Sequence, residues 1–126
     1  MVQVDISQLS GECNTWREQL RRYKDEFNQD EARLRQVASQ ALSKDQLHDV
    51  EHLHNQFHIQ LINIHDLKQA IKIHDRKMNF EMDTFNGSVN EESLAQHENL
   101  LNEYQGLGQT LNNLRGEFND FLKRTS

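Results

Sequence analysis

Apolar side chains recur at alternating steps of four and three residues through the first third of the chain, and this spacing constrains the fold most. Nine of these ten positions are apolar or aromatic: Leu9, Cys13, Trp16, Leu20, Tyr23, Phe27, Asp30, Leu34, Val37 and Ala41. In an α-helix, positions spaced in this way share one narrow stripe, which must pack against another helix to be buried. We therefore predict a long helix over residues 5–42.

The same spacing returns twice, which predicts two further helices over residues 44–86 and 89–124. Their stripes would be Leu47, Val50, His54, Phe57, Leu61, Ile64, Lys68, Ile71, Asp75, Met78, Met82 and Phe85, and then Leu94, His97, Leu100, Tyr104, Leu107, Leu111, Leu114, Phe118 and Phe121. Asp5 or Ser7 can cap the first helix. Ser43 to Gln46 and Ser88 to Glu91 have the spacing of a capping box, and Gly87 suits the left-handed conformation that ends a helix.

The composition agrees with a single domain of long helices spanning residues 1–126. The chain has no proline, the residue that most strongly interrupts helices, so long helices are possible. Hydrophobic residues make up 35%, below the globular norm of about 45–50%, as expected where only a stripe of each helix is buried. The predicted fold class is all-α: a long antiparallel three-helix bundle with coiled-coil-like heptad packing. Gly106 and Gly108 are the expected place for a kink in the third helix.

Folding the chain back at its two joints predicts which stripe residues share a layer. Phe27, Phe57 and Phe118 should lie side by side. The same register puts Cys13 between Ile71 and Tyr104, where it would be a small buried apolar side chain rather than a nucleophile.

A second prediction from this register is a polar layer formed by Asp30 and His54. Each interrupts an otherwise apolar stripe, and a polar layer of this kind can fix the register of a bundle. Six of the seven histidines lie in the second helix, where we interpret them as a polar face. The alternative is a metal site with a histidine and carboxylate ligand set of Asp30, His54 and His58, because imidazoles four residues apart share one face of a helix.

The second helix also carries apolar side chains away from its stripe: Ile59, Ile62, Ile73 and Phe80. A helix that packs on two neighbours needs a wider apolar arc, which would use these residues inside one molecule. The other use is a dimer surface, and we favour it because so thin a bundle has little core for each residue.

The charge pattern excludes several classes of partner. The net charge is −6, which repels nucleic acid, and basic residues are too scattered to form a face for lipid headgroups. No apolar run approaches the roughly 20 residues needed to cross a bilayer, so we expect no membrane partner. The single cysteine cannot form an intramolecular disulfide, and the N-terminus lacks the features of a signal peptide. The expected location is the cytoplasm.

No catalytic or cofactor-binding pattern is present in the sequence, so we expect a protein that is not an enzyme and needs no cofactor. The long heptads and the second apolar stripe favour protein–protein interaction or assembly, with a second copy of the chain as the expected partner. The alternative function is that of a metal-binding helical bundle.

Overall fold

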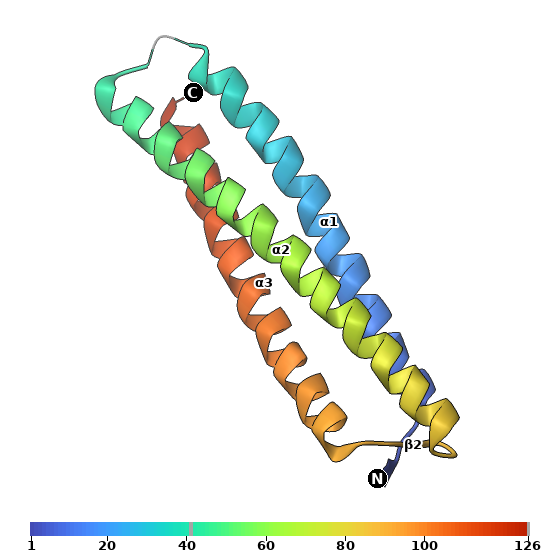
Figure 1. Ribbon diagram of the computed structural model, residues 1–126. Coiled ribbons are helices and arrows are strands. Elements are labelled where there is room, and N and C mark those ends of the chain that lie inside the picture. Colours follow the sequence, from blue (N-terminus) through green and yellow to red (C-terminus); the bar gives the residue numbers. More distant parts are fainter. Residues whose placement is uncertain (41, 126) are drawn as a thin grey trace.

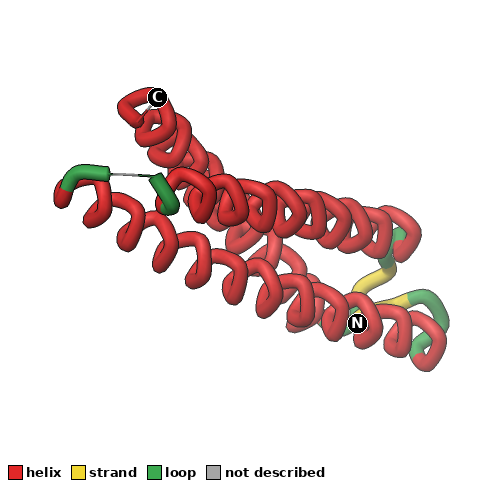
Figure 2. The backbone as a smooth tube through the Cα atoms, turned by 90° about the horizontal axis from the view of Figure 1, so that it is seen from above, coloured by secondary structure: helices red, strands yellow, loops and turns green. Residues whose placement is uncertain are grey.

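Three long helices form an antiparallel bundle in the computed structural model, which describes residues 1–40 and 42–125. They are α1 (Ile6–Ala38), α2 (Lys44–Thr84) and α3 (Glu91–Thr125). Figure 1 shows α2 running against α1 and α3, with the N-terminus and the α2–α3 connection at one end of the molecule. The C-terminus and the α1–α2 connection lie at the other end, and Figure 2 shows the same arrangement from above. The predicted all-α three-helix bundle is confirmed.

The first turns of α1 and α2 are capped by the residues identified in the sequence. The Asp5 carboxylate accepts hydrogen bonds from the backbone N–H groups of Ser7 and Gln8. Ser43 and Gln46 form the predicted capping box at the start of α2. α1 ends at Ala38, four residues earlier than predicted, and the last predicted stripe position, Ala41, lies outside the described residues.

The connection from α2 to α3 differs from the prediction. Ser88 does not cap α3, because it lies in β2 (Ser88–Val89), which pairs antiparallel with β1 (Val2–Gln3). The side chain of Asn90 takes the capping role by accepting the N–H of Glu92 at 3.0 Å. Gly87 has a φ of +85°, so its predicted left-handed conformation is confirmed. The two short strands were not predicted, and they hold the N-terminus across the end of the bundle.

A buried glutamate joins the end of α2 to the start of α3 through hydrogen bonds. Glu81 is 5% exposed, and its carboxylate accepts the backbone N–H of Asn90 at 2.6 Å. The hydroxyl of Ser93 also donates to both carboxylate oxygens, at 3.0 and 2.7 Å. Burial raises the pKa of Glu81, but these hydrogen bonds, with the positive charge of Lys77, outweigh it and lower the pKa below its usual value.

The centre of the bundle contains the predicted aromatic layer. The rings of Phe27 and Phe57 meet edge to face at 5.4 Å, and those of Phe57 and Phe118 at 5.2 Å. All three side chains are at most 1% exposed. The register predicted around residue 57 is therefore confirmed.

α3 continues as a helix through Gly106 and Gly108, so these glycines do not end it.

The buried side of α2 is rotated relative to the predicted stripe. The positions 57, 64, 71 and 78 are buried as predicted, but their buried neighbours are Leu53, Gln60, Leu67, His74 and Glu81. The predicted neighbours on the other flank are half-buried or exposed. Leu47 and Phe85, at the ends of the predicted stripe, are exposed. α2 packs on two helices at once, so both flanks are partly covered and a single narrow stripe describes it poorly.

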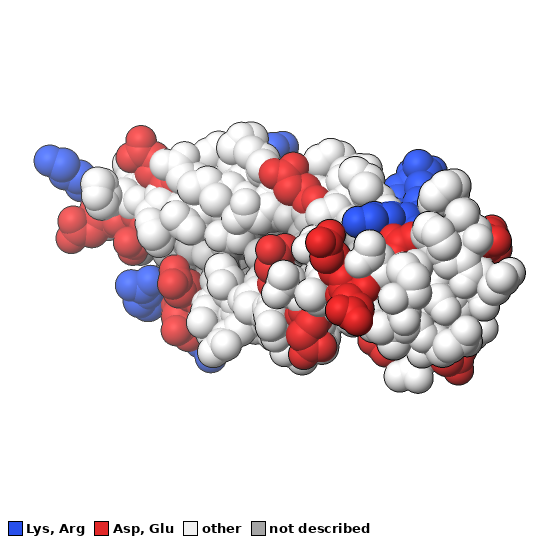
Figure 3. Space-filling view, turned by 60° about the horizontal axis from the view of Figure 1, so that its bottom comes forward, with Lys and Arg blue, Asp and Glu red and all other residues white. Residues whose placement is uncertain are grey.

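Charged and uncharged side chains are interspersed on the outside of the molecule. On the face in Figure 3, where the end that carries β2 comes forward, acidic side chains are spread between the uncharged ones. Within residues 1–40 and 42–125, none of the helices is long and apolar enough to cross a bilayer.

Candidate metal centre

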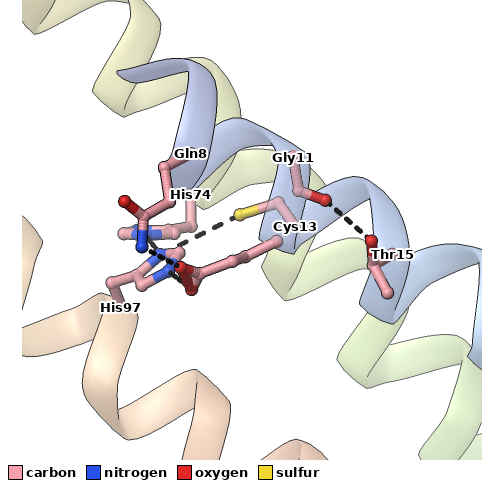
Figure 4. A network of polar contacts seen from close by, with 7 residues as sticks. Gln8, Gly11, Cys13, Thr15, His74 and His97 are labelled. Carbon is pink, nitrogen blue, oxygen red and sulfur yellow. Dashed lines mark hydrogen bonds and ion pairs between the residues drawn. The ribbon is translucent and has the colours of Figure 1, made fainter. Parts of the chain in front are cut away.

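Three polar side chains, one from each helix, converge inside the bundle near the α2–α3 end. They are Cys13 on α1, His74 on α2 and His97 on α3, and their exposed fractions are 0%, 3% and 6%. Figure 4 shows the thiol and the two imidazole rings turned toward one another. One potential ligand atom from each residue lies within 4.8 Å of the other two, the one such group of three or more in the part of the chain described.

The separations are close to those that a zinc ion requires. Nδ1 of His97 lies 3.0 Å from Nε2 of His74 and 4.0 Å from Sγ of Cys13. With Zn–N bonds of about 2.0–2.1 Å and a Zn–S bond of about 2.3 Å, tetrahedral geometry sets N···N at about 3.3 Å and S···N at about 3.6 Å. The two separations from His97 therefore each need to change by about 0.3–0.4 Å, and the three ligand atoms all lie within 4.8 Å of one another.

A carboxylate fixes the orientation of one of the two rings. Oε2 of Glu12 lies 3.0 Å from Nε2 of His97. Ionised carboxylates only accept hydrogen bonds, so Nε2 of His97 must carry the hydrogen. In the neutral ring, Nδ1 then has the free lone pair, and it faces His74 and Cys13. A histidine held by a carboxylate in this way is the usual arrangement around protein-bound metals.

The second ring has an unpaired nitrogen. With both rings neutral, Nε2 of His74 donates to Nδ1 of His97, which leaves Nδ1 of His74 with a lone pair. This atom is buried and has no hydrogen-bond partner, the one such side-chain atom among the described residues. Buried polar atoms without partners are rare because each costs roughly 1–3 kcal/mol. The protein alone does not satisfy the hydrogen-bonding capacity of this centre.

Burial and neighbouring charges keep both Cys13 and His74 uncharged. Burial, with a smaller effect from the nearby His97, lowers the pKa of His74 to about 4, so the ring is neutral at physiological pH. Burial, with the charges of Asp75 and Glu12, raises the pKa of the Cys13 thiol to about 12. The two carboxylates that disfavour a thiolate favour a cation at the same place. A bound metal ion would replace the thiol proton.

Aromatic packing closes the centre on the side that leads to the rest of the core. The ring of Trp16 lies over His97 with centroids 4.8 Å apart, and Tyr104 stacks on Trp16 at 5.8 Å. The sequence predicted Tyr104 beside Cys13, but Tyr104 lies beside Trp16, about one helical turn further along α1. His97 occupies the position next to the thiol instead.

The predicted polar layer of Asp30 and His54 does not form. Asp30 is bound by the guanidinium of Arg115, with Nε 2.8 Å from Oδ2, and Arg115 also contacts Glu26 at 2.9 Å. His54 has a side chain 53% exposed and lies 3.0 Å from Glu31. The prediction was wrong because α2 buries the flank of Leu53, which turns the adjacent His54 outward, and because α3 supplies an arginine to Asp30.

The alternative metal site of Asp30, His54 and His58 fails for the same reason. His58 is exposed, and Asp30 is already held by Arg115.

The second apolar group of α2 is on the surface, so it does not pack on the neighbouring helices of the same molecule. Its exposed fractions are 45% for Ile59, 48% for Ile62, 65% for Ile73 and 67% for Phe80.

Sequence reasoning missed the centre although two of its residues were on predicted stripes. Cys13 and His97 each occupy a stripe position, and a polar residue there is a signal for a buried interaction. His74 gave no such signal, because the predicted stripe used its neighbour Asp75. Cys13 lies 84 positions before His97 in the chain and His74 lies 23 positions before it, so no local motif joins the three residues.

Comparisons with protein-family models, with curated protein sequences and with solved structures found no match for this chain.

Proposed function

We propose that this protein binds one divalent transition-metal ion, with Zn²⁺ the best match, through Cys13, His74 and His97. The observation that carries the proposal is the convergence of a thiol and two imidazoles from three helices, with a carboxylate behind one of the rings. Thiolate and imidazole ligands favour zinc over magnesium or calcium, which prefer oxygen. Three protein ligands leave the fourth tetrahedral position to a small ligand such as water.

The ion would join the three helices rather than act on a substrate. Each proposed ligand is at most 6% exposed, and Trp16 covers His97 from the core side. Such burial leaves little room for a substrate beside the ion, so we keep the proposal that the protein is not an enzyme. Binding would instead stabilise the bundle, because an ion held only by the folded state shifts the equilibrium toward it.

Cobalt(II) titration tests the proposal, because Co²⁺ replaces Zn²⁺ in such sites and a cobalt–thiolate bond has its own charge-transfer absorption. The chain has a single cysteine, so that absorption would report Cys13 alone. We expect one equivalent of Co²⁺ to bind, zinc to displace it, and Cys13→Ala to remove the thiolate absorption. His58→Ala is the matched control, since His58 is an exposed histidine on α2. Wild-type protein that binds neither ion, or equal losses in His58→Ala and His97→Ala, would contradict the proposal.

A second candidate function is assembly through the apolar face of α2, formed by Ile59, Ile62, Ile73 and Phe80. Exposed fractions of 45–67% on four large apolar residues favour it, since these side chains gain by leaving water. We propose a homodimer through this face in a cytoplasmic protein, where reducing conditions would keep the Cys13 thiol available. The metal centre lies on the buried side of α2, so the two functions are compatible.

Light scattering and sedimentation test the assembly. We expect the mass of a dimer for the wild type and that of a monomer for the double variant Ile73→Glu and Phe80→Glu. The helical content should be unchanged in both, because these residues contribute little to the core. Wild-type protein that stays monomeric at high concentration would refute the homodimer.

A further inference from the structure

We infer that Glu12 is the positioning residue of the metal centre, and that the ion enters the centre on the side where Glu12 lies. The inference rests on the proposed function, because it assigns a role around an ion bound by Cys13, His74 and His97. Glu12 would hold His97 with Nδ1 toward the ion and Nε2–H toward its own carboxylate. It would not itself be a ligand.

Glu12 lies between solvent and the metal centre. Its side chain is 35% exposed, whereas the His97 side chain that it contacts is 8% exposed. Gln8, one turn earlier on α1 and exposed, donates from Nε2 to Oε1 of Glu12 at 3.3 Å. A chain of polar contacts therefore runs from the surface through Glu12 to His97 and on to His74. Trp16 covers His97 from another direction with an apolar ring. The polar access to the buried ligands is thus on the Glu12 side.

Glu12 also selects one of the two tautomers of His97. The Oε2–Nε2 separation of 3.0 Å is a hydrogen bond, and the carboxylate can only accept it. Without that acceptor, the hydrogen of the neutral ring could lie on Nδ1, and this nitrogen could not then bind a cation. Second-shell carboxylates of this kind typically contribute a factor of about 10–100 to metal affinity.

The charge of Glu12 also acts on the centre. Glu12 and Asp75 both act on the Cys13 thiol as negative charges, and Arg17 acts as a positive one. A divalent ion that approaches along the Glu12 side meets the half-exposed carboxylate before the buried ligands. Its attraction to the Glu12 carboxylate at the edge of the centre favours loading, and this attraction is stronger where burial reduces screening.

The experiment compares Glu12→Ala and Glu12→Gln with wild type, with Zn²⁺ as the probe and a chelator as competitor. Glu98→Ala is the matched control, because Glu98 is an exposed glutamate adjacent to His97 on α3. We expect about a 10–100-fold loss of affinity in Glu12→Ala and a smaller loss in Glu12→Gln, whose amide oxygen can still accept from Nε2. Glu98→Ala should stay close to wild type. Zinc release to the chelator should also be faster in Glu12→Ala.

Nitrogen-15 NMR of the histidine rings separates positioning from other roles. In the zinc-loaded wild type, Nε2 of His97 should carry a hydrogen and Nδ1 should not. A Glu12→Ala affinity equal to that of wild type, or an unprotonated Nε2 of His97 in the zinc-loaded wild type, would overturn the role of Glu12 and leave the metal site itself intact. Absence of zinc binding to wild-type protein would refute the proposed function instead, and with it this inference.

Discussion

The aromatic layer at the middle of the bundle and the cysteine–histidine centre near its end are both built from one residue of each helix, yet they differ in what they need. Phe27, Phe57 and Phe118 fill their layer with edge-to-face rings that are almost fully buried. Apolar packing of this kind is complete without any ligand. The centre, in contrast, buries polar groups and leaves Nδ1 of His74 without a partner.

This difference separates a layer whose side chains satisfy one another from one that leaves a buried polar atom without a partner. Replacing the polar centre by apolar side chains of similar size would remove the cost of burying polar groups, so stability alone does not explain it. The proposed cation would, because Nδ1 of His97 and Nε2 of His74 could each give it a lone pair and it would replace the proton of the Cys13 thiol. The following predictions test the contrast between the two layers.

The largest expected effect is on the aromatic layer. Phe57→Ala should lower the free energy of unfolding by about 3–5 kcal/mol, since it removes a buried ring and leaves a cavity. Urea denaturation followed by circular dichroism measures this loss. Ile62→Ala, on the exposed side of α2, should change stability by no more than about 0.5 kcal/mol. Similar losses in the two variants would show that the layer is not the core of the bundle.

Metal should stabilise the protein only through the cysteine–histidine centre. At a free Zn²⁺ concentration of about 100 times the dissociation constant, the free energy of unfolding should rise by about 2.7 kcal/mol. Urea denaturation with zinc and with a chelator gives the difference. The increment should persist in His58→Ala and disappear in Cys13→Ala. An equal increment in Cys13→Ala would locate the stabilising ion elsewhere.

Glu81 should make the junction of α2 and α3 sensitive to acid. Its folded-state pKa is lowered, so its contribution is complete above the ordinary pKa of 4.5 and is lost as pH falls through the folded value. Near neutral pH, Glu81→Gln should cost about 1.5 kcal/mol through loss of charge-assisted hydrogen bonds.

Urea denaturation of the wild type and Glu81→Gln between neutral pH and pH 3 measures this contribution. The gap in stability between the two should narrow as the pH falls. Glu92→Gln, an exposed neighbour at the start of α3, is the control. A gap that stays constant with pH would mean that Glu81 is not ionised in the folded protein.

The smallest effect concerns the ion pair that replaced the predicted Asp30–His54 layer. A double-mutant cycle between Asp30 and Arg115 should give a coupling of about 0.5–1 kcal/mol, because Arg115 has a side chain 36% exposed and is partly screened by water. The cycle between Asp30 and His54 should give none. Coupling in the second cycle and not in the first would restore the predicted register.

Much of the fold could be predicted because its causes are local. Asp5, Ser43 and Gly87 have side chains or backbone freedom suited to helix ends, and the structure uses each of them. The heptad spacing also identified residues that α1 and α3 bury, including Cys13 and His97. These are properties of a single helix and its ends, and a sequence displays them directly.

Tertiary structure alone decided which flank of α2 faces inward. A spacing of three or four residues from Phe57 leads to Gln60 or Leu61, and the same choice further along separates His74 from Asp75. Which flank is covered depends on the side of α2 where each of the other helices packs, and no local pattern specifies that side. The sequence therefore determined three helices and their central layer. Only their packing brought Cys13, His74 and His97 together, because the three side chains share no helix and no motif.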